Sequence, residues 1–330
     1  MKRRAFIAFI GGSGAAAAWS QAARAQSQRI PKIGVLWHAG SKEEEGLYFP
    51  ALIQGFTDLG YIEGRNVTFE HRYAGEQYER FSAQAAELVD LRVDALIASI
   101  KPAALAAQRT TEKVPIVFVI VPDPVESKLV ASLAKPGANI TGLSNMSSEL
   151  GAKRLQLIKE AVGGLSRIAL LVNSNDPATA NRFVHDNRTA GAALKIDVIP
   201  IEVGVPKDLQ RAFAMAADRR VEAVVPVIDS MFFNERERLA KLAIAHRLPT
   251  MAANLDMVDA GALMAFGPNH ATLFRQSAKL VDKILKGQRA GDIPVEQPTH
   301  FELRINLKTA SAIGINLPKT LLARADKVIE

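Results

Sequence analysis

The sequence predicts an α/β protein of two similar lobes, each built on a doubly wound parallel sheet. From Pro31 onward, short apolar runs alternate with amphipathic segments of helical length, which is typical of parallel sheets covered by helices. The run Ile-Val-Phe-Val-Ile-Val at 116–121 has no polar alternation, which indicates a strand buried on both faces. The same order of runs starts again at Arg167. A chain of 330 residues is long enough for two domains with a core each.

The first half of the chain carries five predicted strands with helices between them. Each strand is a short apolar run, and each helix has one apolar face, as with Phe81, Ala85 and Leu88. Pro122 ends the fourth strand because proline cannot continue a central strand. The predicted strands are 32–37, 66–71, 93–99, 116–121 and 139–144, and the predicted helices are 48–59, 78–90, 102–111 and a short one before the turn Lys135-Pro136-Gly137.

The second half repeats the first at offsets of about 120 to 135 residues, in the same order. Any α/β protein repeats strand–helix units, but several ordered matches favour two similar lobes. The tail adds a helix at 271–285 and an apolar–polar alternation at 301–307, which would let the chain recross between lobes. The matching segments are 32–38 with 167–173, 93–97 with 221–225, 113–116 with 247–250, and 140–144 with 261–266. We expect lobe one to comprise 31–141 plus 267–295, and lobe two 142–266 plus 296–330.

The N-terminal segment 1–25 is predicted to be a cleavable signal peptide. Basic residues at 2–4 precede an apolar, small-residue stretch at 5–18, and Ala23-Arg24-Ala25 supplies a cleavage pattern. The alternative is a membrane anchor, but about 14 residues rich in Gly and Ala are too few to span a bilayer comfortably. The run Arg3-Arg4-Ala5-Phe6-Ile7 resembles a twin-arginine export signal, although general secretory signals carry paired arginines too. We therefore expect a periplasmic protein.

Composition and motifs exclude several classes of function. The chain has no cysteine, so disulfides, thiolate metal sites and cysteine nucleophiles are excluded. Without the leader the formal charge falls from +7 to +3, because the leader holds four basic residues and no acidic one. This charge does not indicate nucleic-acid binding. The six histidines show no metal-binding spacing, and no phosphate-binding loop or catalytic serine motif stands in the mature chain. We expect no metal and no cofactor.

The residues that follow the strands are the candidate ligand-binding residues, because parallel strand ends converge on the cleft in folds of this kind. Most are Ser, Asn or Asp, which supply hydrogen bonds and ion pairing to a small polar ligand and form no obvious reaction centre. No catalytic residue is predicted. The candidate set is Trp37, His38, Ser99, Pro102, Asp123, Ser144, Asn173, Ser174, Asn175, Asp229, Asn254 and Phe266.

A few of these positions have a sharper chemical interpretation. Pro102 and Pro177 stand where helices begin, and a helix start attracts anions such as a carboxylate. Both are equally well explained as turn or cap residues. Asp229 follows an apolar strand, where it could pair with a ligand ammonium. Trp37 and Phe266 either stack on an aromatic ligand or pack in the core, and both alternatives stay open.

Several segments together carry a family resemblance across nearly the whole mature chain. They are the leader, Gly55-Phe-Thr-Asp-Leu-Gly-Tyr-Ile-Glu-Gly-Arg-Asn66, Pro115-Ile-Val-Phe with Asp123-Pro-Val, Lys135-Pro-Gly-Ala-Asn-Ile-Thr-Gly142, and Ile305-Asn-Leu-Lys-Thr-Ala310. The chain resembles the ABC-transporter substrate-binding proteins of the tryptophan-binding type. The resemblance implies a type I periplasmic-binding fold, in which two lobes joined by three crossovers close on a ligand, often an aromatic amino acid.

The resemblance also implies site residues and a partner. Ser99, Pro102 and Asp123 correspond to site loops of lobe one, and Asn173, Ser174 and Asp229 to site loops of lobe two. Lys101 departs from the pattern, since relatives often have a small polar residue there, and the later positions of the loop 228–232 differ as well. The expected partner is a membrane permease with its ATPase, to which the bound ligand is delivered.

We therefore expect an exported solute receptor that performs no chemistry and acts as a monomer. Its mechanism would be lobe closure on a small polar or carboxylate-bearing molecule, such as an amino acid or aromatic compound. One alternative is an exported enzyme with a Rossmann-like fold, which the missing nucleotide loop disfavours. Another is an effector-binding regulator of related fold, which the leader in place of a DNA-binding head disfavours.

Overall fold

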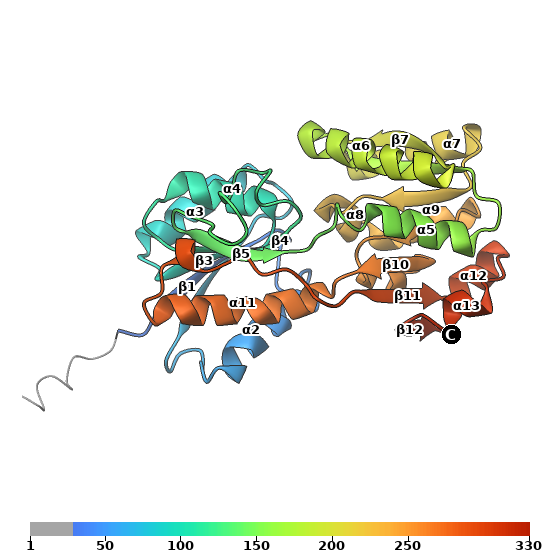
Figure 1. Cartoon of the computed structure of the whole chain (residues 1–330). Coiled ribbons are helices and arrows are strands. Elements are labelled where there is room, and N and C mark those ends of the chain that lie inside the picture. The colour runs from blue at the N-terminus through green and yellow to red at the C-terminus, as the bar shows by residue number, and fades with distance from the viewer. Residues whose placement is uncertain (1–28) are drawn as a thin grey trace, which may run out of the picture.

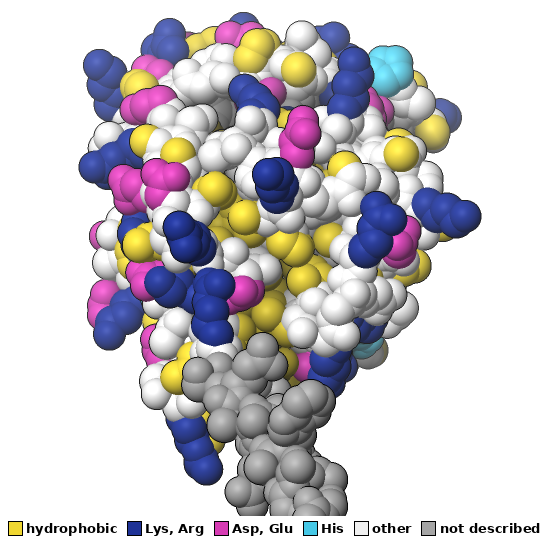
Figure 2. Space-filling model, turned by 90° about the vertical axis from the view of Figure 1, so that its left-hand side faces the viewer, with side chains coloured by type: hydrophobic (Ala, Val, Ile, Leu, Met, Phe, Trp, Pro, Cys, Tyr) yellow, Lys and Arg dark blue, Asp and Glu magenta, His cyan; other side chains and the backbone are white. Residues whose placement is uncertain are grey.

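The computed structural model describes residues 29–330, and within them the chain forms two α/β lobes that lie side by side (Figure 1). The predicted signal peptide, 1–25, lies outside the described residues. Lobe one is here the five-stranded sheet near the N-terminus with its helices, and lobe two is the second sheet with its helices. Figure 2 shows the end of lobe one that points away from lobe two. Basic and acidic side chains are interspersed there around a central group of hydrophobic ones.

Lobe one contains a five-stranded sheet in the order β2-β1-β3-β4-β5, and every neighbouring pair in it is parallel. The helices α2 and α11 cover one face and α3 and α4 the other. The strands are β1 (Lys32–Trp37), β2 (Thr68–Tyr73), β3 (Ala95–Ala98), β4 (Ile116–Val121) and β5 (Ile140–Ser144), and the helices are α2 (Tyr48–Asp58), α3 (Arg80–Asp90), α4 (Lys101–Thr110) and α11 (His270–Leu285).

The alternation of side chains along each strand divides the core of lobe one into two layers. In β1, Ile33, Val35 and Trp37 pack beneath α2 and α11, whereas Leu36 packs beneath α3 and α4. The same division runs through β4, since Val117 packs in the first layer and its neighbours in the second. Successive strand residues point to opposite faces, so a continuous apolar run supplies both layers. The prediction of strands buried on both faces is confirmed.

Lobe two repeats the strand order of lobe one. A bridge between Val224 and Thr250 joins β7-β6-β8 to β9-β10-β11-β12, so β7-β6-β8-β9-β10 corresponds position by position to β2-β1-β3-β4-β5. The sheet departs from a purely parallel one at β11, which runs antiparallel to β10. The strands are β6 (Arg167–Asn173), β7 (Asp197–Val203), β8 (Ala223–Pro226), β9 (Met251–Ala252), β10 (Met264–Gly267), β11 (Glu302–Asn306) and β12 (Lys327–Ile329).

The remaining helices belong mainly to lobe two. Asp176 caps α6 by accepting a hydrogen bond from the Thr179 amide, and Pro177 is the first residue of that helix. Pro102 likewise lies in the first turn of α4, so the two predicted helix starts are confirmed. The helices are α5 (Gly151–Ala161), α6 (Pro177–Leu194), α7 (Leu209–Asp218), α8 (Ser230–Asn234), α9 (Arg236–Ala245), α10 (Asp256–Asp259), α12 (Leu307–Ile313) and α13 (Lys319–Leu322), with short 3-10 helices η1 (Pro206–Asp208) and η2 (Ala290–Asp292).

The chain passes between the lobes after β5, after β10 and before β11 (Figure 1). The last passage runs beside β5, where the Ser144 amide donates to the Glu296 carbonyl at 3.0 Å and the Glu296 amide to the Gly142 carbonyl at 3.0 Å. The second passage leads into α11, which packs closely on α2. A Cβ at Gly55 would lie 2.2 Å from the Arg275 carbonyl oxygen, so this contact requires glycine.

Several bounds shift by one to three residues, and local hydrogen bonds explain two of the differences from the prediction. The short helix expected before Lys135 is wrong, because the Pro124 carbonyl accepts from the amides of both Leu129 and Val130 and closes a series of turns. The second strand begins at Thr68 rather than at 66. The Asn66 side chain accepts from the Ile62 amide at 2.6 Å and donates to the Gly60 carbonyl at 2.9 Å, which holds that residue in the preceding turn.

Candidate functional site

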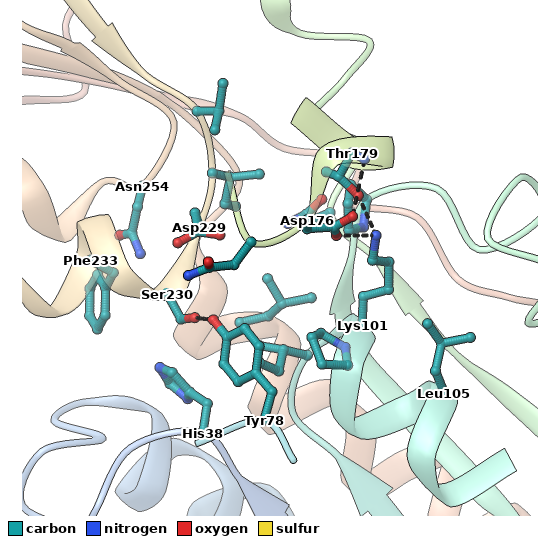
Figure 3. Close-up of a pocket in the computed structure, with 18 of the residues that line it drawn as sticks. His38, Tyr78, Lys101, Leu105, Asp176, Thr179, Asp229, Ser230, Phe233 and Asn254 are labelled. Atoms are coloured by element: carbon teal, nitrogen blue, oxygen red, sulfur yellow. Dashed lines mark hydrogen bonds and ion pairs between the residues drawn. The ribbon is translucent and has the colours of Figure 1, made fainter. Parts of the chain in front are cut away.

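A cavity of about 490 Å³ lies between the lobes where the carboxyl ends of the strands meet (Figure 3). This volume falls within the range of small-molecule sites, roughly 300–1,000 Å³. Loops that follow strands of both lobes line the cavity, together with the first turns of α4 and α6. The cavity therefore occupies the position that the order of the strands predicts for a ligand site.

Five of the predicted site residues line this cavity. His38 follows β1, and Pro102 lies in the first turn of α4. From lobe two, Asn175 follows β6, Asp229 follows β8 and Asn254 follows β9. Strand ends that lie far apart in sequence therefore bring these side chains together around one space.

Trp37 packs in the core, which is the second of the two alternatives for this residue. Its side chain is fully buried, its ring centroid lies 5.3 Å from that of Phe274, and its indole nitrogen donates to His71 Nδ1 at 3.0 Å. The alternation along β1 turns Trp37 toward α11 and away from the cavity. Phe266 does not line the cavity either, since it is half-buried on β10 with its ring 6.2 Å from that of Phe301.

Other predicted residues lie just behind the cavity wall. Ser99 is fully buried immediately before α4, and its hydroxyl has no hydrogen-bond partner among the described residues. The Ser144 hydroxyl donates to the Pro122 carbonyl at 3.1 Å and so ties the ends of β4 and β5 together. Ser174 follows β6, and its amide donates to the Val203 carbonyl at 3.2 Å.

Asp229 is the carboxylate whose surroundings are best defined. It caps α8 by accepting from the Met231 amide at 2.9 Å, and the Asn173 side-chain amide donates to both of its oxygens, at 3.0 and 3.2 Å. Burial raises the pKa of the Asp229 carboxyl, and the hydrogen bond from Asn173 opposes that shift. No lysine or arginine of residues 29–330 pairs with it. A ligand cation would therefore find a buried carboxylate that no lysine or arginine neutralises.

An aromatic wall stands at one end of the cavity. Tyr48, at the start of α2, stacks on Phe233 of α8 with ring centroids 5.5 Å apart. The Tyr48 hydroxyl accepts from Asn254 at 2.9 Å and donates to Asp256 at 3.1 Å. The Arg236 guanidinium lies over the Phe233 ring, 4.6 Å from its centroid, and Phe274 stacks on Tyr48 with ring centroids 5.1 Å apart. The stacked rings therefore form a rigid apolar wall against which an aromatic group could pack.

Polar contacts hold the two lobes together around the cavity. Lys101 Nζ at the start of α4 lies 2.7 Å from Asp176 Oδ2 of lobe two and also bonds the Thr179 hydroxyl (Figure 3). The Tyr78 hydroxyl of lobe one bonds Ser230 of lobe two. These contacts join residues of opposite lobes, so the structure represents a closed cleft.

Asp123, a predicted ligand-binding residue, belongs to a second group of contacts between the lobes and does not line the cavity. Its carboxylate lies 3.2 Å from the Arg182 guanidinium of α6 and accepts from Ser148 at 2.7 Å. Arg182 also pairs with Glu126 and with Asp186. Asp123 therefore serves the closure of the lobes in this structure.

Sequence reasoning missed Tyr48, Tyr78 and Phe233, which all line the cavity. They lie one loop or one helical turn beyond a strand end, whereas the predicted residues lie close after each strand. For Tyr48 and Phe233 the signal is their place in the first turn of the helix that follows the strand. Lys101 was noted only as a departure from the family pattern, and its partner in lobe two is not visible in the sequence.

The part of the chain that the structure describes contains neither a cluster of metal ligands nor a membrane-spanning helix. Among residues 29–330, no three His, Asp or Glu side chains gather closely enough to hold a metal ion. Within the same range, no helix has the length and apolar character needed to cross a membrane.

Comparisons with known proteins agree on one family. A family model described as ABC transporter substrate binding protein matches residues 45–329. A tyrosine-binding protein of Clostridioides difficile is 27% identical over 265 residues, which cover 80% of this chain and 75% of that protein.

Two solved structures also resemble this chain. A conserved domain protein from Vibrio cholerae has a TM-score of 0.85 at 27% identity, covering 91% of this chain and all of that one. A domain from Streptococcus pneumoniae in complex with L-Trp has a TM-score of 0.81 at 23% identity, covering 91% and 99% of the two chains. The fold is therefore that of type I periplasmic binding proteins.

Proposed function

Because the chain belongs to the ABC transporter substrate binding protein family, we propose that it is an exported receptor for an aromatic amino acid. The observation that carries the choice of ligand is a closed cavity that combines an unpaired carboxylate, Asp229, with the aromatic wall of Tyr48 and Phe233. The C. difficile relative binds tyrosine by its name, and the S. pneumoniae structure contains L-Trp. Both support the proposal.

In this proposal each part of the ligand has its own partner. The ammonium pairs with Asp229, which Asn173 positions. The carboxylate lies near the start of α4, where no side chain caps the helix and the buried Ser99 hydroxyl has no partner among the described residues. The ring packs against the wall that Tyr48 and Phe233 form, while Asn175 and Asn254 line the space between.

The binding step is a closure of two lobes, comprising 31–141 plus 267–295 and 142–266 plus 296–330. The three passages between them act as the hinge, and the pairs Lys101–Asp176 and Asp123–Arg182 form when the cleft closes. The ligand contributes contacts to both lobes only in the closed form and shifts the equilibrium toward it. The packing of α11 on α2 supports its place in lobe one.

The closed receptor then delivers its ligand to a membrane permease without changing it chemically. Export by the segment 1–25 places the protein in the periplasm, where it acts as a monomer with no nucleic-acid partner and no cofactor. The mixed basic and acidic surface at the end of lobe one is consistent with a protein that does not bind nucleic acid (Figure 2).

A thermal-shift screen of the purified protein tests this function. The panel contains the aromatic amino acids, aliphatic amino acids and aromatic acids that lack an amine. We expect aromatic amino acids to raise the melting temperature in proportion to the logarithm of their concentration above Kd, and aromatic acids without an amine to have little effect. A panel that produces no shift would contradict the proposal, and so would chemical conversion of a bound compound.

A further inference from the structure

A buried histidine–glutamate pair stands at the aromatic end of the cavity. His38 lines the cavity directly after β1 and is 4% exposed, and its ring centroid lies 6.4 Å from that of Phe233. Behind it, the fully buried Glu45 places Oε1 3.0 Å from His38 Nδ1. The Ala39 amide donates to the same oxygen at 2.9 Å, which fixes the position of the carboxylate.

This pair determines which ring nitrogen serves the cavity. Nδ1 lies 3.0 Å from Glu45 Oε1 in an ion pair rather than in an aligned hydrogen bond, so the carboxylate favours a proton on that nitrogen and leaves Nε2 for a ligand. Figure 3 shows the ring among Ser230, Tyr78 and Phe233. Nε2 accepts a hydrogen bond when the imidazole is neutral and donates one when it is protonated.

The surroundings of His38 are acidic. Glu76, in the loop after β2, has both carboxylate oxygens buried beside Asn234 and Ser230, and Asp229 faces His38 from lobe two. Burial lowers the pKa of His38, but Glu45, Glu76 and Asp229 together outweigh burial and raise it above its ordinary value. The other titratable or charged groups nearby are Tyr48, Tyr78, Asp256, His270 and Arg236.

We propose that His38, oriented by Glu45, selects ligands with a polar group on the aromatic ring and prefers a phenol hydroxyl to an indole N–H. A phenol hydroxyl both donates and accepts, so it can bond Nε2 in either protonation state. An indole N–H only donates, so it bonds Nε2 only when the imidazole is neutral. A plain phenyl ring bonds Nε2 in neither state. This inference rests on the proposed function and adds a rank order to it: tyrosine, then tryptophan, then phenylalanine.

The pH dependence follows from the charge state of His38. Its raised pKa keeps the imidazolium present below that value and the neutral ring above it. Tryptophan affinity should therefore be full above the pKa of His38 and fall as the pH drops through it. Tyrosine affinity should change little over the same range. The ratio of tyrosine to tryptophan affinity accordingly rises toward acid pH.

The test is calorimetric titration of the intact mature protein with L-tyrosine, L-tryptophan and L-phenylalanine from about pH 5 to about pH 8, the range in which histidine titrates. We expect tyrosine to bind about 10- to 100-fold more tightly than phenylalanine, as a hydrogen bond to a charged group allows. His38→Leu should reduce that ratio to near one and remove the pH dependence of tryptophan binding. Glu45→Gln keeps the shape of the side chain but removes the charge that raises the pKa of His38. It should therefore move the midpoint of tryptophan affinity against pH to a lower pH.

Three controls keep the outcomes distinct. Glu70→Gln alters a half-buried carboxylate outside the cavity that pairs with Lys32 and Arg72. It should change neither the ratio of tyrosine to phenylalanine affinity nor the midpoint of the tryptophan profile. The imidazole NMR signals of His38 report its titration directly, with and without tyrosine, in case a variant folds poorly. A flat tryptophan profile, or an unmoved midpoint in Glu45→Gln, would overturn the role of His38. If none of the three amino acids binds, the proposed function fails and this inference fails with it.

Discussion

Replacing Asp229 by asparagine separates ligand recognition from stability. The Asp229 carboxylate forms no salt bridge with a lysine or arginine among residues 29–330, and His38 is the cation-forming side chain that faces it, so a ligand ammonium would supply a counter-charge that no lysine or arginine provides. Removing one member of a desolvated charge pair costs roughly 2–5 kcal/mol in binding, which corresponds to about 30- to 4,000-fold in Kd. Asparagine keeps an oxygen for the Met231 amide and caps helices about as well as aspartate. Asparagine has only one of the two oxygens to which Asn173 donates, so stability should change by no more than about 1 kcal/mol, the net value of one hydrogen bond.

Calorimetric titration with the best-binding aromatic amino acid, together with urea unfolding of the ligand-free protein, measures both quantities. Asp208→Asn is the matched control, because Asp208 also accepts backbone amides, from Gly204 and Val205 at 3.3 Å, but lies outside the cavity. It should leave Kd unchanged. An Asp229→Asn affinity within about threefold of the wild type would refute the ammonium contact. A fall in unfolding free energy as large as the fall in binding free energy would show that the residue is structural.

Three further predictions test closure, packing and pH dependence. Lys101→Met removes the ion pair with Asp176 that crosses the cleft. Stopped-flow fluorescence should show that the ligand is released about fivefold faster, as for an ion pair worth about 1 kcal/mol. An unchanged release rate would exclude this ion pair from closure of the cleft. Gly55→Ala places a methyl group 2.2 Å from the Arg275 carbonyl oxygen and should lower stability by about 1–3 kcal/mol, which thermal melts measure. The control is Gly163→Ala, whose methyl group would meet no atom within 4 Å, and it should lower stability far less. Burial lowers the pKa of His71 from 6.5 to about 4, so between these pH values the unfolded chain binds a proton at His71 and the folded chain does not. The free energy of unfolding should therefore fall as the pH drops from 6.5 toward 4. Urea unfolding should show a weaker fall in His71→Phe, and an equal fall would contradict the assignment.

The regular elements were predictable where a single local pattern controls them. The strands 32–37, 116–121 and 167–173 were predicted with the bounds that the structure shows, because short, largely apolar runs bounded by polar residues or proline favour a buried strand. The segment before Lys135 was not, since its hydrogen bonds return to the Pro124 carbonyl. The start of β2 was misplaced for a similar reason, as Asn66 bonds within its own turn.

Some residues of the candidate site were predictable from the local sequence, whereas others depend on packing against distant elements. The end of an apolar strand can be read from sequence, and this is how His38 and Asp229 were found. The neighbouring Trp37 was open to two interpretations, and the choice between them depended on which face of β1 the helix α11 covers. That helix lies more than two hundred residues further along the chain.

The α/β class, the two similar lobes and the strand ends around which the cavity forms follow from the amino-acid sequence, because they depend on apolar periodicity and on proline and glycine at turns. The set of side chains that share the cavity depends on how the two lobes pack. Lys101 meets Asp176, Tyr78 meets Ser230, and Asp123 meets Arg182 only when the lobes close. Such contacts join residues with no local relationship, so the packing of the lobes, rather than any motif, makes Asp229 a ligand-binding candidate and Asp123 part of the closure.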